Sequence, residues 1–224
     1  MQRFQTIPVL MLTALLGLSG TVIASTGGDG HDVASTATTT ADAAQDPRQL
    51  VQQTAEQVMA RLQRERSELK AHPERIYELV KDLILPHFDF DGMSRWVLGR
   101  HWQQATPAQR QQFETQFRDL MVRTYSSALL RYDSEHIEYL SGHDLGKSNQ
   151  ALVRTLIRQS DQVSIPVDYR LYMDKSQQWK VFDMSIDGVS LITNYRRSFA
   201  EQIRRVGLNG LIDRLVQHNQ ANAS

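Results

Sequence analysis

The stretch WKVFDMSIDGVSLITNYRRSF, residues 179–199, contains the pattern of a strand followed directly by the pattern of a helix. The β-forming side chains of its first half are Val181, Phe182, Met184 and Ile186. The pair Asp187-Gly188 ends that run, because both residues favour turns. Tyr195 and Phe199 then stand four residues apart, which places them on one face of a helix. The stretch predicts a strand that turns into a helix within a few residues.

Upstream of this stretch, apolar residues alternate with a period of two, which indicates further strands. The predicted strands are residues 136–140, 151–158 and 163–173, followed by the strand that begins at Trp179. Pro166 interrupts the third run and favours an edge position or a bulge, because proline has no N–H to donate. The short links between successive strands predict an antiparallel meander.

Apolar residues at helical spacing occupy most of the remaining chain. The predicted helices are residues 47–69, 73–83, 88–98 and 107–132, and two closing helices that divide near residues 207–210. Asp46 and Thr106 each stand before a proline, with glutamine three residues further on, which is the pattern of a capped helix start. The order predicts an α+β fold: a curved antiparallel sheet of about four strands, wrapped by helices and enclosing an apolar pocket.

The N-terminus is typical of an exported protein. Arg3 precedes an apolar run over residues 7–18, and Val22-Ile23-Ala24 offers small residues before a cleavage position. We expect a cleaved signal peptide over residues 1–24 and therefore an exported protein; the alternative is a membrane anchor that is not cleaved. Residues 25–45 are rich in Ser, Thr and Ala with no aromatic side chain, which predicts a disordered leader. A single ligand-binding domain is expected over residues 46–219.

Composition excludes several classes of function. The 25 basic and 25 acidic residues balance, so no net field attracts nucleic acid. The chain has no cysteine, which removes disulfides, thiol catalysis and Cys-ligated zinc. No two of the seven histidines show metal-ligand spacing on a helix, and no phosphate-binding glycine loop is present. We expect no metal site and no cofactor.

Candidates for catalysis are weak. Asp89 and Asp91 follow His87 and could form a carboxylate site, but capping of the helix that begins there is the more common role of such an Asp. Asp168 is the third candidate for a general base, in an apolar pocket of an α+β enzyme. His143-Asp144 lies in a loop pattern, where neighbouring side chains usually point apart.

Two other groups of residues are candidates for binding. Arg196 and Arg197 could contact an anionic head group or an acidic partner, or could form an ordinary solvated helix face. The apolar and aromatic candidates for a pocket wall are Phe113, Phe117, Tyr125, Val167, Tyr169, Leu171, Met184, Tyr195 and Phe199. Periodicity alone favours a packed core for these nine, because a core and an apolar pocket have the same sequence pattern.

The wording of residues 179–199 resembles the MlaC (toluene-tolerance) family, in which W-x-V-x-D-x-x-x-x-G-V-S is followed by N-Y-R-x-x-F. Three upstream segments are similar to the family in the same order. They are FDGMSRWVLG (residues 90–99) with Trp102, then Gln109-Arg110 with Phe113 and Phe117, and VDYRL (residues 167–171). The resemblance extends from about residue 47 to 216. Trp96 departs from it, since a small or aliphatic residue is usual there, whereas the basic residue after Leu-Gly is kept as Arg100.

The resemblance implies a monomeric periplasmic phospholipid carrier without enzymatic activity. It would move glycerophospholipid between an outer-membrane lipoprotein–porin complex and an inner-membrane ABC transporter, which maintains the lipid asymmetry of the outer membrane. The nine apolar candidates would then line the lipid pocket, with a hydroxyl of Tyr125, Tyr169 or Tyr195 at its mouth. Two alternatives remain: a periplasmic adaptor that holds no ligand, and a proton-transfer enzyme that uses one of the three aspartates.

Overall fold

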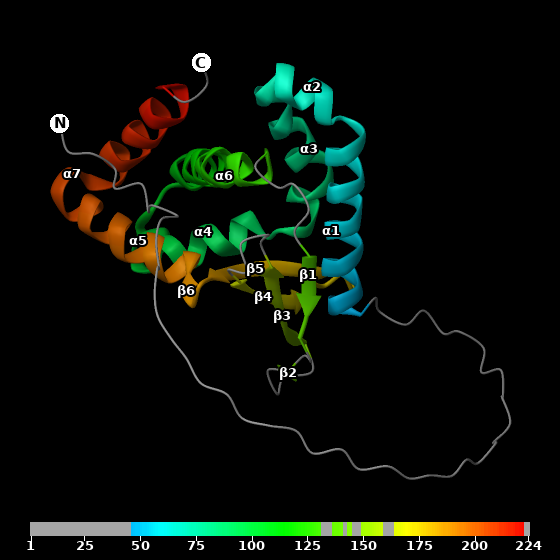
Figure 1. Cartoon of the computed structure of the whole chain (residues 1–224). Helices are drawn as coiled ribbons and strands as arrows, with labels where there is room; N and C mark the ends of the chain where they lie inside the picture. Colours follow the sequence, from blue (N-terminus) through cyan, green and yellow to red (C-terminus); the bar gives the residue numbers. More distant parts are fainter. Residues whose placement is uncertain (1–45, 131–135, 141–142, 145–148, 159–163, 222–224) are drawn as a thin grey trace, which may run out of the picture. The chain divides into compact units, whose positions relative to one another are not determined.

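Residues 179–199 form two strands and the start of a helix in the computed structural model, which describes residues 46–130, 136–140, 143–144, 149–158 and 164–221. Strand β5 (Trp179–Ile186) pairs with the two-residue strand β6 (Val189–Ser190), and helix α7 (Leu191–Ala221) follows at once (Figure 1). The turn between the strands is Asp187-Gly188, with φ of 51° and 75°. Two positive φ values are typical of the tightest hairpin turns, for which Asp-Gly is a preferred pair.

The start of α7 is held by two side chains of the same stretch. The Ser190 hydroxyl accepts a hydrogen bond from the backbone N–H of Thr193 (3.1 Å) and donates one to Asp183 (2.7 Å). Asp183 is 4% exposed, and its other carboxylate oxygen accepts from the backbone N–H of Ile192 at 3.2 Å. A helix leaves its first N–H groups without intrahelical partners, and these contacts satisfy two of them. Asp183 and Ser190 therefore stabilise the start of α7.

Replacing Asp183 with alanine is expected to lower the free energy of unfolding by about 2–3 kcal/mol, because a buried N–H would lose its acceptor. Urea denaturation followed by circular dichroism measures the change. The matched control is Asp168→Ala, a half-buried aspartate opposite Ser185 in the register of β4 and β5, with an expected cost below about 1 kcal/mol. Equal costs for the two variants would contradict this role of Asp183.

The sheet contains the four predicted strands and two short additional ones. The long strands are β1 (His136–Tyr139), β3 (Gln150–Arg158), β4 (Ser164–Met173) and β5. The sheet order is β1-β3-β4-β5-β6, with the two-residue β2 (His143–Asp144) paired to β3, and every pairing between these strands is antiparallel. The predicted meander is confirmed.

Pro166 lies in an interior strand, so the predicted edge position is wrong, as is the alternative of a bulge at that residue. Strand β4 pairs with β3 on one side, where Pro166 is opposite Leu156, and with β5 on the other. The Pro166 carbonyl accepts from Asp187 N–H at 2.9 Å, so its N–H side faces the turn after β5. The strand tolerates proline because the missing donor falls where the pairing with β5 ends.

A bulge does occur, in β5. Arg170 pairs with Asp183 and Leu171 pairs with Val181, which leaves Phe182 as an extra residue between them. Side chains normally alternate between the two faces of a sheet, and the extra residue reverses this alternation along β5. Val181 therefore lies on the same face as Met184, although the two are three residues apart. This explains how a strand with apolar residues at 181, 184 and 186 can place all three on one face of the sheet.

The helices follow the predicted pattern except that the first predicted helix is divided at Glu65, the second begins as a 3₁₀ turn, and the short helix at Arg100–Gln104 was not predicted. They are α1 (Pro47–Arg64), α2 (Arg66–Ala71), α3 (Ile76–Leu83), α4 (Phe90–Leu98), α5 (Arg100–Gln104) and α6 (Pro107–Leu130), with 3₁₀ turns at Pro73–Arg75 and Leu85–His87. The capping box at the start of α6 is present, since Thr106 and Gln109 exchange two hydrogen bonds of 2.9 and 3.2 Å. Gly207, with φ of 73°, divides α7 into the two predicted helices.

The buried side chains form three separate clusters. The helical cluster joins α4, α6 and α7, which pack against one another. The N-terminal cluster joins α1, α2 and α3, and the sheet cluster joins α1 with β3, β4 and β5. A domain of this size usually has one contiguous core. The fold is the predicted α+β arrangement of helices on an antiparallel sheet, with a divided core.

Among the described helices, none combines the length and apolarity needed to cross a membrane. The predicted signal peptide and leader lie outside the described residues.

Candidate lipid-binding site

The nine predicted wall residues separate into two groups by exposure. Five are fully packed: Phe113, Phe117, Val167, Leu171 and Phe199, none more than 5% exposed. Four keep accessible surface: Tyr125, Tyr169, Met184 and Tyr195. The structure brings six of the nine to the helical cluster, whereas Tyr169 and Leu171 belong to the sheet cluster. Val167 belongs to neither cluster, and Met184 of the helical cluster pairs with Tyr169 of the sheet cluster across β4 and β5.

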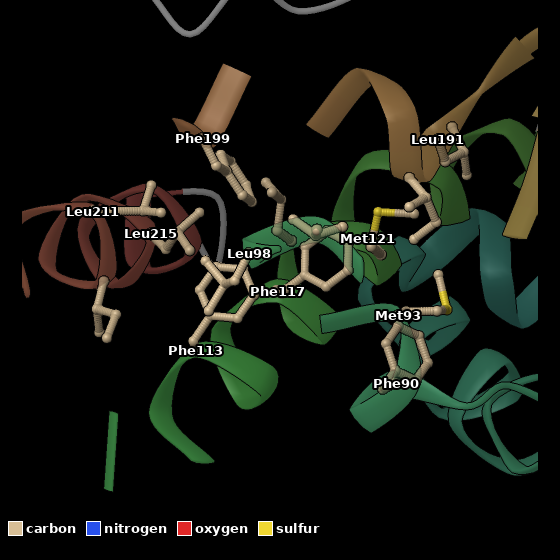
Figure 2. Packing of buried hydrophobic residues seen from close by; sticks show 14 of the residues in the cluster. Phe90, Met93, Leu98, Phe113, Phe117, Met121, Leu191, Phe199, Leu211 and Leu215 are labelled. Carbon is tan, nitrogen blue, oxygen red and sulfur yellow. The ribbon is translucent and has the colours of Figure 1, made fainter. Parts of the chain in front are cut away.

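The fully packed phenylalanines form an aromatic cluster with Tyr195. The Phe117 ring lies 5.7 Å from Phe113, 6.0 Å from Phe199 and 5.5 Å from Tyr195 between centroids. Figure 2 shows Phe113, Phe117 and Phe199 pointing toward one another from α6 and α7, with Leu98 of α4 beside them. Edge-to-face and offset contacts at these distances add to the energy of burial. The aromatic cluster fixes α7 on α6.

The four accessible residues are half-buried. Burial raises the pKa of Tyr169 to about 12, and burial also raises the pKa values of Tyr125 and Tyr195. Their hydroxyls are satisfied within the protein, because Tyr125 bonds with Tyr195, and Tyr169 bonds with Thr155.

The two candidate arginines are exposed on the first half of α7. Arg196 lies against Gly99, where a built Cβ atom would stand 3.2 Å from the guanidinium. Gly99 also has φ of 54°, a conformation that residues with a side chain disfavour. Both the contact with Arg196 and this φ explain why position 99 requires glycine. Arg196 thus packs over the junction of α4 and α5, while Arg197 faces solvent.

A cleft of about 800 Å³ is the feature that the sequence analysis missed. Its lining residues come from α3, the Leu85–His87 turn, the start of α4, one side of α6, and the ends of β4 and β5: Tyr77, Lys81, Leu85, Pro86, Phe88, Asp89, Phe90, Asp91, Glu114, Arg118, Asp119, Val122, Arg123, Tyr172, Asp174 and Lys180. The lining segments are up to about a hundred residues apart in the chain. Only Asp89 and Asp91 among them were sequence candidates.

The floor of the cleft touches all three core clusters. Leu85 packs against the helical and N-terminal clusters, Phe88 against the helical and sheet clusters, and Val122 against the N-terminal cluster. Phe88 also stacks on Phe90 at 5.9 Å and forms an isolated parallel bridge with Val181. The cleft therefore lies where the three parts of the core meet.

The candidate catalytic carboxylates have structural partners. Asp89 caps α4, accepting from Gly92 N–H at 2.9 Å, and also accepts from the Tyr172 hydroxyl at 2.7 Å. Asp91 forms an ion pair with Arg95 one turn further on. Asp168 stands opposite Arg154 in the register of β3 and β4, away from the cleft. The capping role that the sequence favoured for Asp89 is confirmed. In the part of the chain that the structure describes, no three acidic or histidine side chains gather as metal ligands.

The described residues form an α+β protein with helices on an antiparallel sheet and a cleft where the core clusters meet. The chain belongs to the MlaC protein family, whose model matches residues 52–217. It is 29% identical over 182 residues to the intermembrane phospholipid transport system binding protein MlaC of Haemophilus influenzae, covering 80% of this chain and 85% of that protein.

Two further relatives agree with this assignment. The toluene tolerance protein ttg2D of Pseudomonas putida is 28% identical over 167 residues, covering 74% of this chain and 76% of that protein. A phospholipid-binding protein from Ralstonia solanacearum, whose structure was solved in complex with a phospholipid, has 28% identity and a TM-score of 0.74. The match covers 80% of this chain and all of that one. The predicted resemblance is confirmed as family membership.

Proposed function

We propose that this protein is a carrier that holds glycerophospholipid with its acyl chains inside the fold. The observation that carries the proposal is the likeness to the Ralstonia solanacearum protein, which spans that whole chain and was solved with a phospholipid. The name of the Haemophilus influenzae relative, an intermembrane phospholipid transport binding protein, supports the same function.

The acyl chains would lie between the three core clusters. The half-buried side chains that we propose as the wall of this space pack against two of these clusters: Tyr125, Met184 and Tyr195 against the helical cluster, and Tyr139 and Tyr169 against the sheet cluster. The five fully packed candidates would form a second layer that holds this wall in place. Met184 and Tyr169 are direct partners in the register of β4 and β5, so the wall crosses from strand to strand.

Energetics explain why a carrier needs such an interior. Burial of one CH₂ group is worth about 0.8 kcal/mol, so exposing a 16-carbon chain to water costs on the order of 12 kcal/mol. The carrier must offset most of this cost and still release the lipid. An apolar wall of half-buried side chains would meet both requirements. It would keep the acyl chains out of water as a bilayer does, without binding them much more strongly than a bilayer.

The N-terminal sequence and the family support the proposed location and partners. An N-terminal signal peptide would deliver the protein to the periplasm, where it would exchange lipid with an outer-membrane lipoprotein–porin complex and an inner-membrane ABC transporter. Arg196 and Arg197, exposed on α7, are the proposed contacts to a head group or to a partner. The transfer would support lipid asymmetry of the outer membrane.

The carrier function requires no catalytic group. The capping role of Asp89, the ion pair of Asp91 and the position of Asp168 away from the cleft disfavour the enzyme alternative. The adaptor alternative requires a protein that holds no ligand, and the likeness to a protein solved in complex with a phospholipid disfavours it.

Native mass spectrometry of the secreted protein, with the ligand released and identified, tests this function. We expect an adduct with the mass of a phospholipid at near-stoichiometric level. A ligand-free mass from gently purified protein would favour the adaptor, and a bound small molecule other than a lipid would favour the enzyme.

A further inference from the structure

We infer that an exposed tryptophan and the arginines around it dock this protein on the surface of an anionic phospholipid bilayer. This inference rests on the proposed carrier function and concerns the surface on which the carrier would exchange its lipid. The residues come from α4, α5, the start of α6 and the first half of α7. We call them the arginine patch: Arg95, Trp96, Arg100, Trp102, Arg110, Arg196 and Arg197.

Trp96 is the most exposed large apolar side chain among the described residues, at 57%. It lies on the outer side of α4, whose other side packs Phe90, Met93 and Val97 into the helical cluster. The ring therefore contributes little to the core and is available to a partner. Tryptophan is enriched at the boundary between lipid and water, where its ring lies at the level of the head groups.

Arg196 of α7 lies beside Trp96 at the end of α4. Its guanidinium is 3.2 Å from the Cβ position of Gly99, and residues 96 and 99 stand three apart, which places them on the same side of a helix. Arg197 and Arg100 are exposed next to this contact. Among the residues that the structure describes, no carboxylate forms an ion pair with Arg100, Arg196 or Arg197.

Trp102 connects the patch across three helices. Arg95 of α4 lies 5.8 Å and Arg110 of α6 lies 5.2 Å from the centre of the Trp102 ring. Arg110 also donates to the Trp102 carbonyl at 3.0 Å. These contacts hold two guanidinium groups against α5, which also carries Arg100.

The patch concentrates positive charge, although the whole chain is neutral. No aspartate or glutamate occurs in residues 92–113 or 188–200, and the charged side chains of these two segments are the five arginines of the patch. Asp91, just before the first segment, pairs with Arg95. This excess complements a bilayer that contains anionic lipids, and arginine binds phosphate oxygens through two parallel hydrogen bonds.

The composition of the patch favours a bilayer over an acidic protein as the partner. Stable protein interfaces bury about 800 Å² on each side around an apolar centre. Within the described part of the chain, Trp96 is the one large apolar side chain of the patch that is exposed by more than a third. A single ring is too small for such a centre, whereas a ring among arginines suits the head-group region of a bilayer.

The patch also borders the cleft. Asp91 lines the cleft and forms its ion pair with Arg95, one helical turn further along α4. Docking through the patch would therefore bring the cleft, where the three core clusters meet, close to the bilayer. Exchange of a lipid between the protein and a membrane requires this proximity.

Sedimentation with vesicles at low salt tests the docking surface. The secreted protein is mixed with vesicles of phosphatidylcholine alone, or of equal parts phosphatidylcholine and phosphatidylglycerol, and the bound fraction is measured. We expect binding to the anionic vesicles to be stronger by at least about tenfold, because several arginines each add attraction to an anionic surface. The difference should shrink as added salt screens these charges.

Two variants test the two parts of the patch. Arg100→Gln should weaken binding to the anionic vesicles by about fivefold, the attraction of one arginine. Trp96→Ala should weaken it by about tenfold, because the apolar ring is lost. The matched controls are Arg64→Gln on α1 and Leu140→Ala after β1, both exposed and outside the patch, and neither should alter binding. Circular dichroism establishes that all four variants are folded.

Three results would overturn the docking surface. They are equal binding of wild type to both kinds of vesicle, binding to neither, and patch variants that bind as well as their controls. With binding to neither, the arginines would be contacts for an acidic protein.

Phospholipid extracted from the same preparations separates this inference from the carrier function. Wild type that contains phospholipid but does not bind anionic vesicles would overturn the docking surface alone. Wild type that binds these vesicles but contains no phospholipid would overturn the carrier function and leave the docking surface.

Discussion

Replacing Met184 with arginine is expected to empty the protein of phospholipid, with bound lipid reduced by at least about tenfold. Met184 is half-buried in β5, packs against the helical cluster and pairs with Tyr169 across the sheet. A guanidinium at this position would meet acyl chains instead of water. Leaving a charge next to hydrocarbon costs several kcal/mol, enough to displace the chains. Lipid extracted from the purified variant and quantified by mass spectrometry gives the result.

The controls for Met184 separate loss of lipid from loss of fold. Met184→Leu keeps the volume and should keep the lipid, while Met184→Gln, neutral and polar, should fall between the two. Circular dichroism and urea denaturation establish that each variant is folded. A folded arginine variant that retains as much phospholipid as wild type would remove Met184 from the lipid wall. Arginine at Val167 or Leu171 would be a poorer test, because those side chains are 5% and 0% exposed and support the fold itself.

Replacing Phe117 with alanine is expected to destabilise the protein by about 3–5 kcal/mol. Phe117 is 0% exposed and contacts three other rings, two of them on α7. Its removal would leave a cavity at the contact of α6 with α7, where the surrounding rings cannot close together without moving a helix. The free energy of unfolding from urea denaturation, on lipid-free protein, measures the loss without any contribution from bound ligand.

The matched control for Phe117 is Phe182→Ala. Phe182 is the bulged residue of β5, half-buried, with one ring contact to Tyr172 at 6.0 Å. Its replacement should cost about 1–2 kcal/mol. A Phe117 variant no less stable than the Phe182 variant would show that the aromatic cluster does not hold the two helices together.

The sequence by itself determined the elements and their order, because their causes are local. Asp187-Gly188 predicts a turn at any position in a protein, and Thr106 with Gln109 can cap a helix from four residues alone. Both features are present in the structure. The alternation of the strands and the short links between them were enough for the antiparallel meander, and the four similar segments were enough for the family.

Only the tertiary structure decided which apolar side chains are packed and which keep accessible surface. Phe117 and Tyr195 each belong to an apolar run with helical spacing in the sequence. Phe117 is fully buried in the structure, whereas Tyr195 keeps some accessible surface. The bulge at Phe182 and the position of Pro166 opposite a turn also depend on the partner strand. The cleft is the clearest case, since it joins Lys81, Glu114 and Lys180, which no local pattern relates. Hydrogen bonds of turns and caps act over a few residues, whereas the space left between core clusters depends on how distant segments pack together.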